Sequence, residues 1–295
     1  MSAITASLVK ELREKTGAGM MECKKALQKT AGDLEAAIET LRKEGLAKAV
    51  KKAGRVASEG VIVVLTSTDK KRAVIVEVNC ETDFVARDEN LRKFSEQVAE
   101  CALSKNIADA NVIGDEIFQE TGESIETARK ALVAKLGENI QIRRIAIVES
   151  DHQVCTYKHG DRIAVLVALD QDNESLGKDI AMHIAASRPT SISPDDVAPE
   201  IVEKEREIFA ALAQSSGKPA DIVEKMIEGR IKKFLNEVSL VGQPFVKDPN
   251  QTVGQLLKSA NANVVAFQRF ELGEGIEKKQ ENFEEEVMAQ VRGKE

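Results

Sequence analysis

Residues 81–88 (ETDFVARD) carry the residue types best suited to an interaction site. They follow the apolar run VIVEVN and contain Phe84, although the whole chain has only 9 Phe, 1 Tyr and no Trp. In one interpretation Phe84 is a hydrophobic staple on a helix that Asp88 caps. In the other, the ring protrudes and wedges between helices of another protein, where Asp83 perturbs polar groups. The residues alone favour the staple.

A second candidate site follows the glycine-rich turn at residues 16–19 (TGAG). On a helix that begins near Met20, the side chain of Met20 shares an apolar face with Cys23 and Leu27, whereas Met21 falls outside that face. An exposed thioether is flexible and can adapt to a partner surface. Met21 could equally contact another part of this chain, and the sequence does not decide between the two.

Motifs of the common enzymes are absent, since the chain has no GxxxxGK[ST], HExxH, GxSxG or strand-borne GxGxxG. The nearest metal-like spacing is His152, Cys155 and His159. On a strand, His152 and Cys155 would point to opposite faces, so we expect no metal site. His183, in the apolar segment IAMHIAAS, is predicted to be a packed helix residue rather than a general base. We therefore expect no cofactor, and catalysis by a nonstandard set of residues stays open at this point.

Composition excludes several classes of protein. With 295 residues, 42% hydrophobic and 31% charged, the chain is long enough for about two globular domains. Its net charge of −7 argues against a surface that binds nucleic acid throughout, although residues 1–56 carry 12 Lys and Arg against 7 Asp and Glu. The longest apolar stretch, residues 163–169, is too short to cross a membrane.

The N-terminus shows no apolar core of a secretory signal, and the four cysteines are far apart. We therefore expect a cytoplasmic protein with reduced thiols. Helical spacing predicts three short helices in residues 1–56, near residues 4–15, from Met20, and from the cap Asp33 to a last residue at Gly45. They would form a three-helix bundle, followed by a Lys-rich linker.

From Gly60 the periodicity becomes that of strands. A hairpin, two helices and a strand are predicted in residues 60–149, and the same order recurs in residues 152–274. The expected fold class is α+β, with a duplicated core of small antiparallel sheets covered by helices. The expected units are the partner-docking bundle with its linker (1–56), an N-terminal core subdomain (57–148), a C-terminal core subdomain with a helical insertion (149–275) and a C-terminal helical module (276–295).

The second half contains an additional helical hairpin at about residues 194–238. Two amphipathic stretches flank residues 215–219 (SSGKP), so they should pair and project from the sheet. The hairpin could add stability or form an arm that contacts a partner or a second copy. At the C-terminus, Phe283, Val287 and Val291 form an apolar stripe on an acidic helix, which we expect to dock on the body.

Two segments, LREKTGAGMMECKKAL and EVNCETDFVAR, resemble the sequence signatures of the bacterial translation elongation factor Ts family. The resemblance extends over nearly all of the chain, including HIAAS and the FVKDP region. It implies a ubiquitin-associated-like N-terminal bundle, a two-part core and a helical-hairpin dimerisation module. It also implies nucleotide exchange on the GTPase elongation factor Tu, in which GDP is released so that GTP can bind, without covalent chemistry.

The same resemblance implies roles for particular residues. Thr82, Asp83, Phe84 and Val85 match the motif that intrudes near the partner's magnesium site, and Phe84 matches the wedge between two helices. His159 matches the position that reaches toward the partner's phosphate-binding loop.

Three residues of the N-terminal bundle, Arg13, Met20 and Met21, match the contact with another helix of the GTPase domain. No contact with a membrane or directly with nucleic acid is expected. The role of the hairpin arm is open: it could pair two copies into a homodimer, contact the GTPase, or do both.

Two other classes of function remain. A ribosome- or RNA-binding protein would use the basic bundle and would lose affinity steeply with salt, but the sequence offers no aromatic stacking platform. An enzyme would need an acid–base pair such as Asp83 with a histidine, and the three histidines have no obvious shared site.

Overall fold

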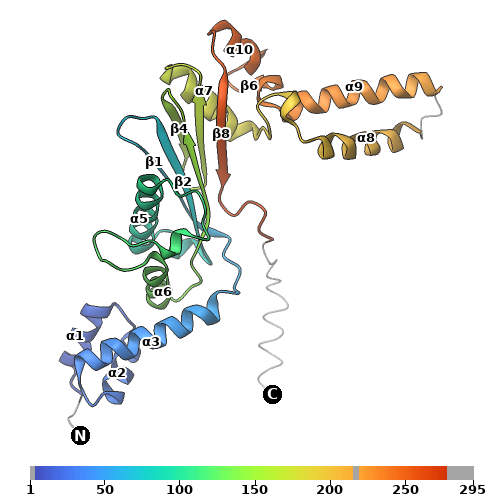
Figure 1. Cartoon of the computed structure of the whole chain (residues 1–295). Coiled ribbons are helices and arrows are strands. Elements are labelled where there is room, and N and C mark those ends of the chain that lie inside the picture. The colour runs from blue at the N-terminus through green and yellow to red at the C-terminus, as the bar shows by residue number, and fades with distance from the viewer. Residues whose placement is uncertain (1–3, 215–218, 278–295) are drawn as a thin grey trace.

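The computed structural model describes residues 4–214 and 219–277. The described chain is elongated: a helical bundle lies at one end, a core of sheets and helices at the centre, and a pair of helices projects sideways near the other end (Figure 1). The fold class is α+β, as predicted. None of the described helices is long and apolar enough to cross a membrane.

The N-terminal bundle consists of α1 (Ala6–Thr16), α2 (Met20–Lys29) and α3 (Leu34–Lys52). Side-chain caps fix two of the helix starts, because Thr5 accepts from the Leu8 amide and Asp33 accepts from the Ala36 amide. The three helices bury a small shared core that includes Leu12, Cys23 and Leu27.

Helix α3 does not end at Gly45, and this part of the sequence prediction is wrong. The helix continues to Lys52 and packs on α6 (Ile125–Leu136), so part of the predicted linker is helical. A Cβ atom on Gly45 would lie only 2.8 Å from the Cβ of Ala134 in α6. The glycine is therefore a point of close helix contact and not a C-terminal cap.

The first half of the core contains β1 (Glu59–Thr66), β2 (Arg72–Cys80) and β3 (Gln141–Glu149), which form an antiparallel sheet in that order. Helices α5 (Glu89–Lys105) and α6 cover one face of this sheet. The β-branched residues of β2 and the apolar side of α5, including Leu91 and Val98, form its main core.

The second half repeats this arrangement. It contains β4 (Val154–His159), β5 (Ile163–Leu169) and β8 (Val264–Glu271), again antiparallel and in chain order. Helices α7 (Glu174–Ser187) and α10 (Val253–Ser259) pack on it, beside a small ribbon of β6 (Pro244–Phe245) and β7 (Asp248–Thr252). The duplication predicted from the sequence is present in the strand order.

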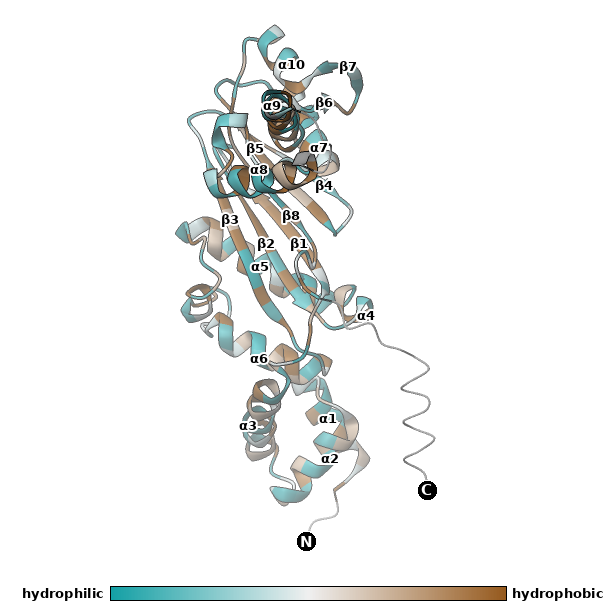
Figure 2. Cartoon of the chain, turned by 90° about the vertical axis from the view of Figure 1, so that its right-hand side faces the viewer, coloured by the Kyte–Doolittle hydropathy of each residue, from teal (hydrophilic) through white to brown (hydrophobic). Residues whose placement is uncertain are grey.

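The two sheets pack against each other through their remaining faces. Ile62 and Ile75 of the first sheet contact a layer that includes Leu166 and Phe270 of the second. The core therefore has the layers helix, sheet, sheet and helix, and the hydrophobic residues concentrate along its strands (Figure 2).

A fully buried carboxylate lies at the junction of the two halves. Glu77 of β2 accepts from Arg143 Nη1 at 3.0 Å, from Arg144 Nε at 2.6 Å and from the Gly273 amide at 2.9 Å. A bulge beside Glu77 leaves Arg143 unpaired in the ladder, so two consecutive arginines reach one carboxylate. Gly273 has φ +72°, and a Cβ there would lie 2.4 Å from the Ser58 carbonyl oxygen.

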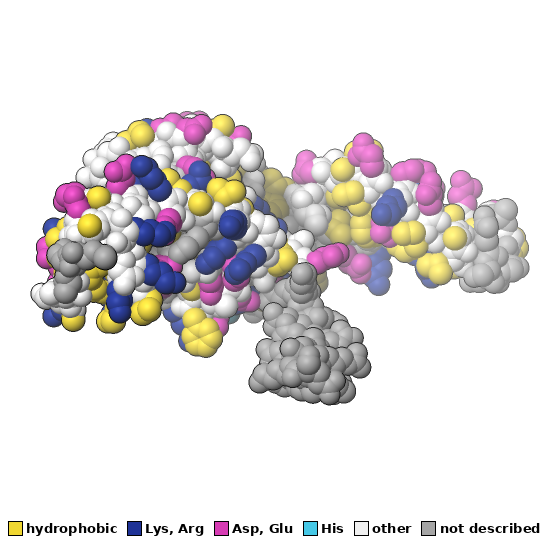
Figure 3. All heavy atoms as spheres, turned by 90° about the horizontal axis from the view of Figure 1, so that it is seen from below, with side chains coloured by type: hydrophobic (Ala, Val, Ile, Leu, Met, Phe, Trp, Pro, Cys, Tyr) yellow, Lys and Arg dark blue, Asp and Glu magenta, His cyan; other side chains and the backbone are white. Residues whose placement is uncertain are grey.

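The projecting arm consists of α8 (Pro199–Gln214) and α9 (Ala220–Val238). The two helices pack together, and Arg230 lies 5.7 Å from the ring of Phe209. Several apolar residues remain exposed on the arm, where they lie among acidic side chains (Figure 3). The predicted C-terminal stripe of Phe283, Val287 and Val291 lies outside the described residues.

Two helix-interior glycines provide a test of the contact between α3 and α6. Alanine in the interior of a helix normally makes the helix more stable than glycine does, by up to about 1 kcal/mol. A Cβ at Gly229 of α9 would meet no atom within 4 Å, so Gly229→Ala should raise the free energy of unfolding. Gly45→Ala should give no gain or a loss, because its methyl group collides with Ala134. Urea unfolding measures both; equal stabilisation would contradict the close contact.

Candidate functional site

The turn after β2 presents Phe84 to solvent. Residues Asp83–Ala86 form the one-turn helix α4, whose N-cap Thr82 accepts from the Val85 amide at 3.4 Å. The side chain of Phe84 is 81% exposed, the largest fraction among the large hydrophobic residues described. The staple interpretation is wrong: Asp88 caps α5 as expected, but within the described residues Phe84 is exposed and does not join the core on which α5 packs.

The neighbours of Phe84 divide between the surface and the core. Asp83 pairs with Arg87 at 2.9 Å on the surface, while Val85 and Ala86 pack on the core of the first half. The chain thus buries one side of the turn and exposes the other. The exposed side carries an aromatic ring beside a carboxylate.

A carboxylate that the sequence analysis missed anchors the start of this turn. Glu138, in the loop between α6 and β3, accepts from the backbone amides of Glu81 at 3.1 Å and Thr82 at 2.9 Å. It also accepts from the Thr82 hydroxyl at 2.6 Å. No spacing or motif in the sequence pairs Glu138 with residues more than fifty positions earlier.

Cys80 lies directly behind the turn and is fully buried. Its thiol donates to the Thr82 carbonyl oxygen at 3.1 Å. Burial, together with the negative charge of Glu138, raises the pKa of the Cys80 thiol to about 12. The thiol therefore stays protonated and serves as a hydrogen-bond donor that supports the turn.

The second candidate site is on the bundle. Met20 and Met21 are 58% and 63% exposed, and Arg13 is exposed as well. The prediction that Met20 shares the buried face with Cys23 and Leu27 is wrong. Met20 is the first residue of α2 and is exposed, although its spacing matches that of the buried Cys23 and Leu27; helical side chains lean toward the N-terminus, which accounts for its exposure at the start of the helix.

His159 is exposed at the end of β4, in the second half of the core. Its Nδ1 lies 3.3 Å from the Tyr157 hydroxyl. The turn after it approaches the first half, because Asp161 pairs with Arg92 of α5 at 2.7 Å. Since α5 directly follows the Phe84 turn, the loops carrying His159 and Phe84 belong to one region of the core. The methionines belong to the bundle.

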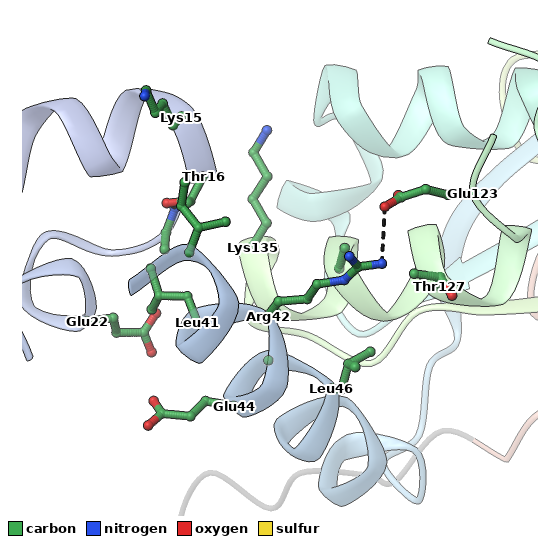
Figure 4. A pocket seen from close by; sticks show the side chains of 15 residues that line it. Lys15, Thr16, Glu22, Leu41, Arg42, Glu44, Leu46, Glu123, Thr127 and Lys135 are labelled. Carbon is green, nitrogen blue, oxygen red and sulfur yellow. Dashed lines mark hydrogen bonds and ion pairs between the residues drawn. The ribbon is translucent and has the colours of Figure 1, made fainter. Parts of the chain in front are cut away.

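A cavity of about 360 Å³ lies between the bundle and α6 (Figure 4). The ion pair of Arg42 with Glu123, at 3.3 Å, lies on one side of it, and Leu41 and Leu46 supply apolar lining. Charged residues of both signs surround the cavity, so it has no marked preference for an anion or a cation.

No group of three or more metal-ligating side chains occurs in the part of the chain that is described. His152 precedes β4 and Cys155 is buried in it. His183 is buried, as predicted, with Nε2 3.0 Å from Gln243 Oε1 and Nδ1 accepting from the Val246 amide. Burial lowers its pKa, so the ring is neutral and carries its proton on Nε2.

Comparison with known proteins identifies the family. The sequence model described as "Elongation factor TS" matches residues 81–274, more than half of the chain. The chain belongs to the elongation factor Ts family. The matched region begins at the Phe84 turn and includes Glu138, His159 and the projecting arm.

Full-length relatives agree with this assignment. The chain is 59% identical to elongation factor Ts of Thioalkalivibrio sulfidiphilus, over 98% of this chain and 99% of the relative. It is 57% identical to that of Legionella pneumophila strain Paris, over 99% and 100%, and 58% identical to that of Methylococcus capsulatus, over 98% and 99%. Membership in the elongation factor Ts family, expected from the two sequence signatures, is confirmed, and it makes the protein a translation factor.

Burial of His183 predicts a pH dependence of stability. Its folded-state pKa is depressed, so the unfolded chain takes up a proton first as the pH falls. Stability should be full above about pH 6.5 and then fall by up to about 1.4 kcal/mol per pH unit. Urea unfolding between pH 7.5 and 5.5 measures this slope. The slope should become shallower in His183→Asn; an unchanged slope in that variant would assign it to other groups.

Proposed function

We propose that this protein is a guanine-nucleotide exchange factor for the GTPase elongation factor Tu. It promotes release of GDP and lets GTP bind, and it performs no covalent chemistry. The observation that carries the proposal is the 81% exposed ring of Phe84 on a turn that is anchored at both ends, within a family motif. An anchored, exposed aromatic ring is suited to insertion between elements of another protein.

Burial of the ring supplies the energy for this insertion. Transfer of a phenylalanine side chain from water into a protein interior contributes on the order of 2 kcal/mol. Because the turn is already fixed, little conformational entropy is lost on binding. That energy can offset a distortion of the partner's nucleotide site.

The groups beside the ring act on the charges that hold the nucleotide. A magnesium ion and backbone amides bind the diphosphate of a GTPase, so displacing either one weakens nucleotide binding. In our proposal the turn of Thr82, Asp83, Phe84 and Val85 disturbs the magnesium site, and His159 reaches the phosphate-binding loop. Exchange factor and nucleotide then weaken each other's binding to the same degree, so GTP expels the factor in turn.

The bundle provides a second contact in this scheme. Arg13, Met20 and Met21 are all exposed on α1 and the start of α2, where they can contact a helix of the GTPase domain. Thioether side chains adapt to an apolar surface with little steric constraint. Contact through the bundle would add affinity without acting on the nucleotide itself.

Release of a fluorescent GDP analogue from elongation factor Tu, followed by stopped flow at fixed magnesium, tests the proposal. Substoichiometric protein should accelerate release. Phe84→Ala should slow the accelerated release by about tenfold or more, because the lost burial energy no longer offsets distortion. Val265→Ala, which shortens a 57% exposed side chain on β8, should have no effect.

Each outcome of this experiment decides a separate point. If the unchanged protein fails to accelerate release while both proteins are folded, the exchange function is refuted. If Phe84→Ala matches the unchanged protein, the ring is not the wedge. Salt-sensitive binding to RNA, in place of any effect on GDP, would favour a nucleic-acid role for the basic bundle.

The arm carries our proposal for self-association. Ile201, Ile208, Leu212 and Ile222 are 43–54% exposed, an unusual number of exposed aliphatic residues for one hairpin. We propose that two copies pair through these side chains to form a homodimer.

Sedimentation velocity over a range of concentrations tests this pairing. The unchanged protein should show a dimer. Ile208→Asp should raise the dimer dissociation constant by roughly tenfold to a hundredfold, because a carboxylate would be buried without a partner. A single species of monomer mass at every concentration would refute pairing through the arm.

A further inference from the structure

The carboxylate of Glu138 accepts three hydrogen bonds from the start of the Phe84 turn. Its carboxylate receives both consecutive amides at the start of the turn and the hydroxyl of the capping residue Thr82. All three donors belong to the two residues that precede α4. Hydrogen bonds to a charged acceptor are stronger than those between neutral groups, so this is the firmest attachment of the turn.

The Thr82 hydroxyl connects Glu138 to the residues that follow, because it bonds to both Glu138 and the Val85 amide. A hydroxyl has one proton to donate, and the 2.6 Å contact commits it to Glu138. The oxygen lone pairs are then directed away from Glu138 and can accept from the Val85 amide, which caps α4. Glu138 thus orients the Thr82 hydroxyl, and this hydroxyl caps α4, the helical turn that contains Asp83 and Phe84.

The internal duplication separates what is common to both halves from what is particular to the first. In both halves, the acidic residue that follows the central strand accepts from the amide of an asparagine just before the third strand. Glu81 accepts from Asn139 at 2.6 Å, and Asp170 accepts from Asn263 at 2.8 Å. These bonds close the same sheet edge in each half.

The residue before that asparagine differs between the halves. It is Glu138 in the first half and the buried Ala262 in the second. The second half has no one-turn helix and no exposed ring at the matching place, residues 170–173. A carboxylate at this position therefore occurs only in the half that presents Phe84, which argues that it serves the turn and not the sheet.

We propose that Glu138 is a positioning residue for nucleotide exchange. It touches neither nucleotide nor magnesium; it holds the Thr82 cap so that Phe84 and Asp83 stand in one orientation when the partner arrives. This inference rests on the proposed exchange function. Loss of the carboxylate leaves the ring in the sequence but lets the turn sample other orientations, so part of the binding energy is used to reorder it.

Exchange kinetics at a series of factor concentrations test the role of Glu138. In Glu138→Ala the saturating rate of GDP release should fall about tenfold, while the half-saturating concentration changes less than about twofold, because the bundle still contacts the partner. Glu138→Gln should retain at least about a third of the rate, since its amide oxygen can accept from both backbone amides and its NH₂ can donate to Thr82.

A matched variant controls for loss of a carboxylate from the same half. Glu116→Ala removes an acidic side chain that pairs with Lys105, away from the turn, and should leave exchange unchanged. A decrease equal to that of Glu138→Ala would overturn the proposal in favour of general destabilisation.

Two further measurements distinguish positioning from stability. Hydrogen exchange of Glu138→Ala should show lost protection at the amides of Glu81, Thr82 and Val85, with β2 and α5 still protected. Exchange by the double variant Phe84→Ala with Glu138→Ala should be slowed by less than the product of the two single effects, because Glu138 acts through the turn that carries Phe84 and Asp83. Additive losses would overturn the proposal.

The outcomes separate this inference from the function on which it rests. If the unchanged protein does not accelerate GDP release, the exchange function and the positioning role fall together. If release is accelerated and Phe84→Ala slows it, but Glu138→Ala matches the unchanged protein, only the positioning role of Glu138 is refuted.

Discussion

The arrangement of the two core halves depends on supplying hydrogen-bond donors to the buried Glu77 carboxylate. A buried carboxylate is tolerated only when its oxygens are fully compensated, and removal of one partner leaves an uncompensated charge. Here the partners come from β3 and from the chain just after β8, so the charge is satisfied only when the second half is in place. The bulge in β3 and the glycine at position 273 are the local distortions that make this possible.

The loop at residues 137–139 relates the bundle to the Phe84 turn. Asn139 Nδ2 donates to the carbonyls of Ala53 and Arg55, where the chain leaves α3, and Lys52 donates to the Gly137 carbonyl. Glu138, between them, holds the start of the turn. One short loop therefore fixes both the exit of the bundle and the exposed ring, so that the two proposed contact surfaces are presented together.

The sequence predicted the elements well, because β-branched strands, helix caps and the repeated order are local signals. Apart from the local error at Met20, the first residue of α2, its errors concern contacts between distant segments. Gly45 looks like a helix end until Ala134 is placed against it. The pattern around Phe84 fits a staple, and only the completed fold shows that Val85 and Ala86 take the buried side instead. Glu138 gave no signal because its partners lie 56 and 57 residues earlier.

The buried thiol of Cys80 bears on behaviour under oxidative stress. Oxidation by peroxides proceeds through the thiolate, and burial raises the pKa of the Cys80 thiol to about 12, so the thiol is protonated at neutral pH. The sulfur also has no exposed surface. A sulfenic acid or glutathione adduct at Cys80 would break the hydrogen bond from its thiol to the Thr82 carbonyl oxygen. The turn is therefore supported by a thiol that is buried and protonated, and so is protected from oxidation.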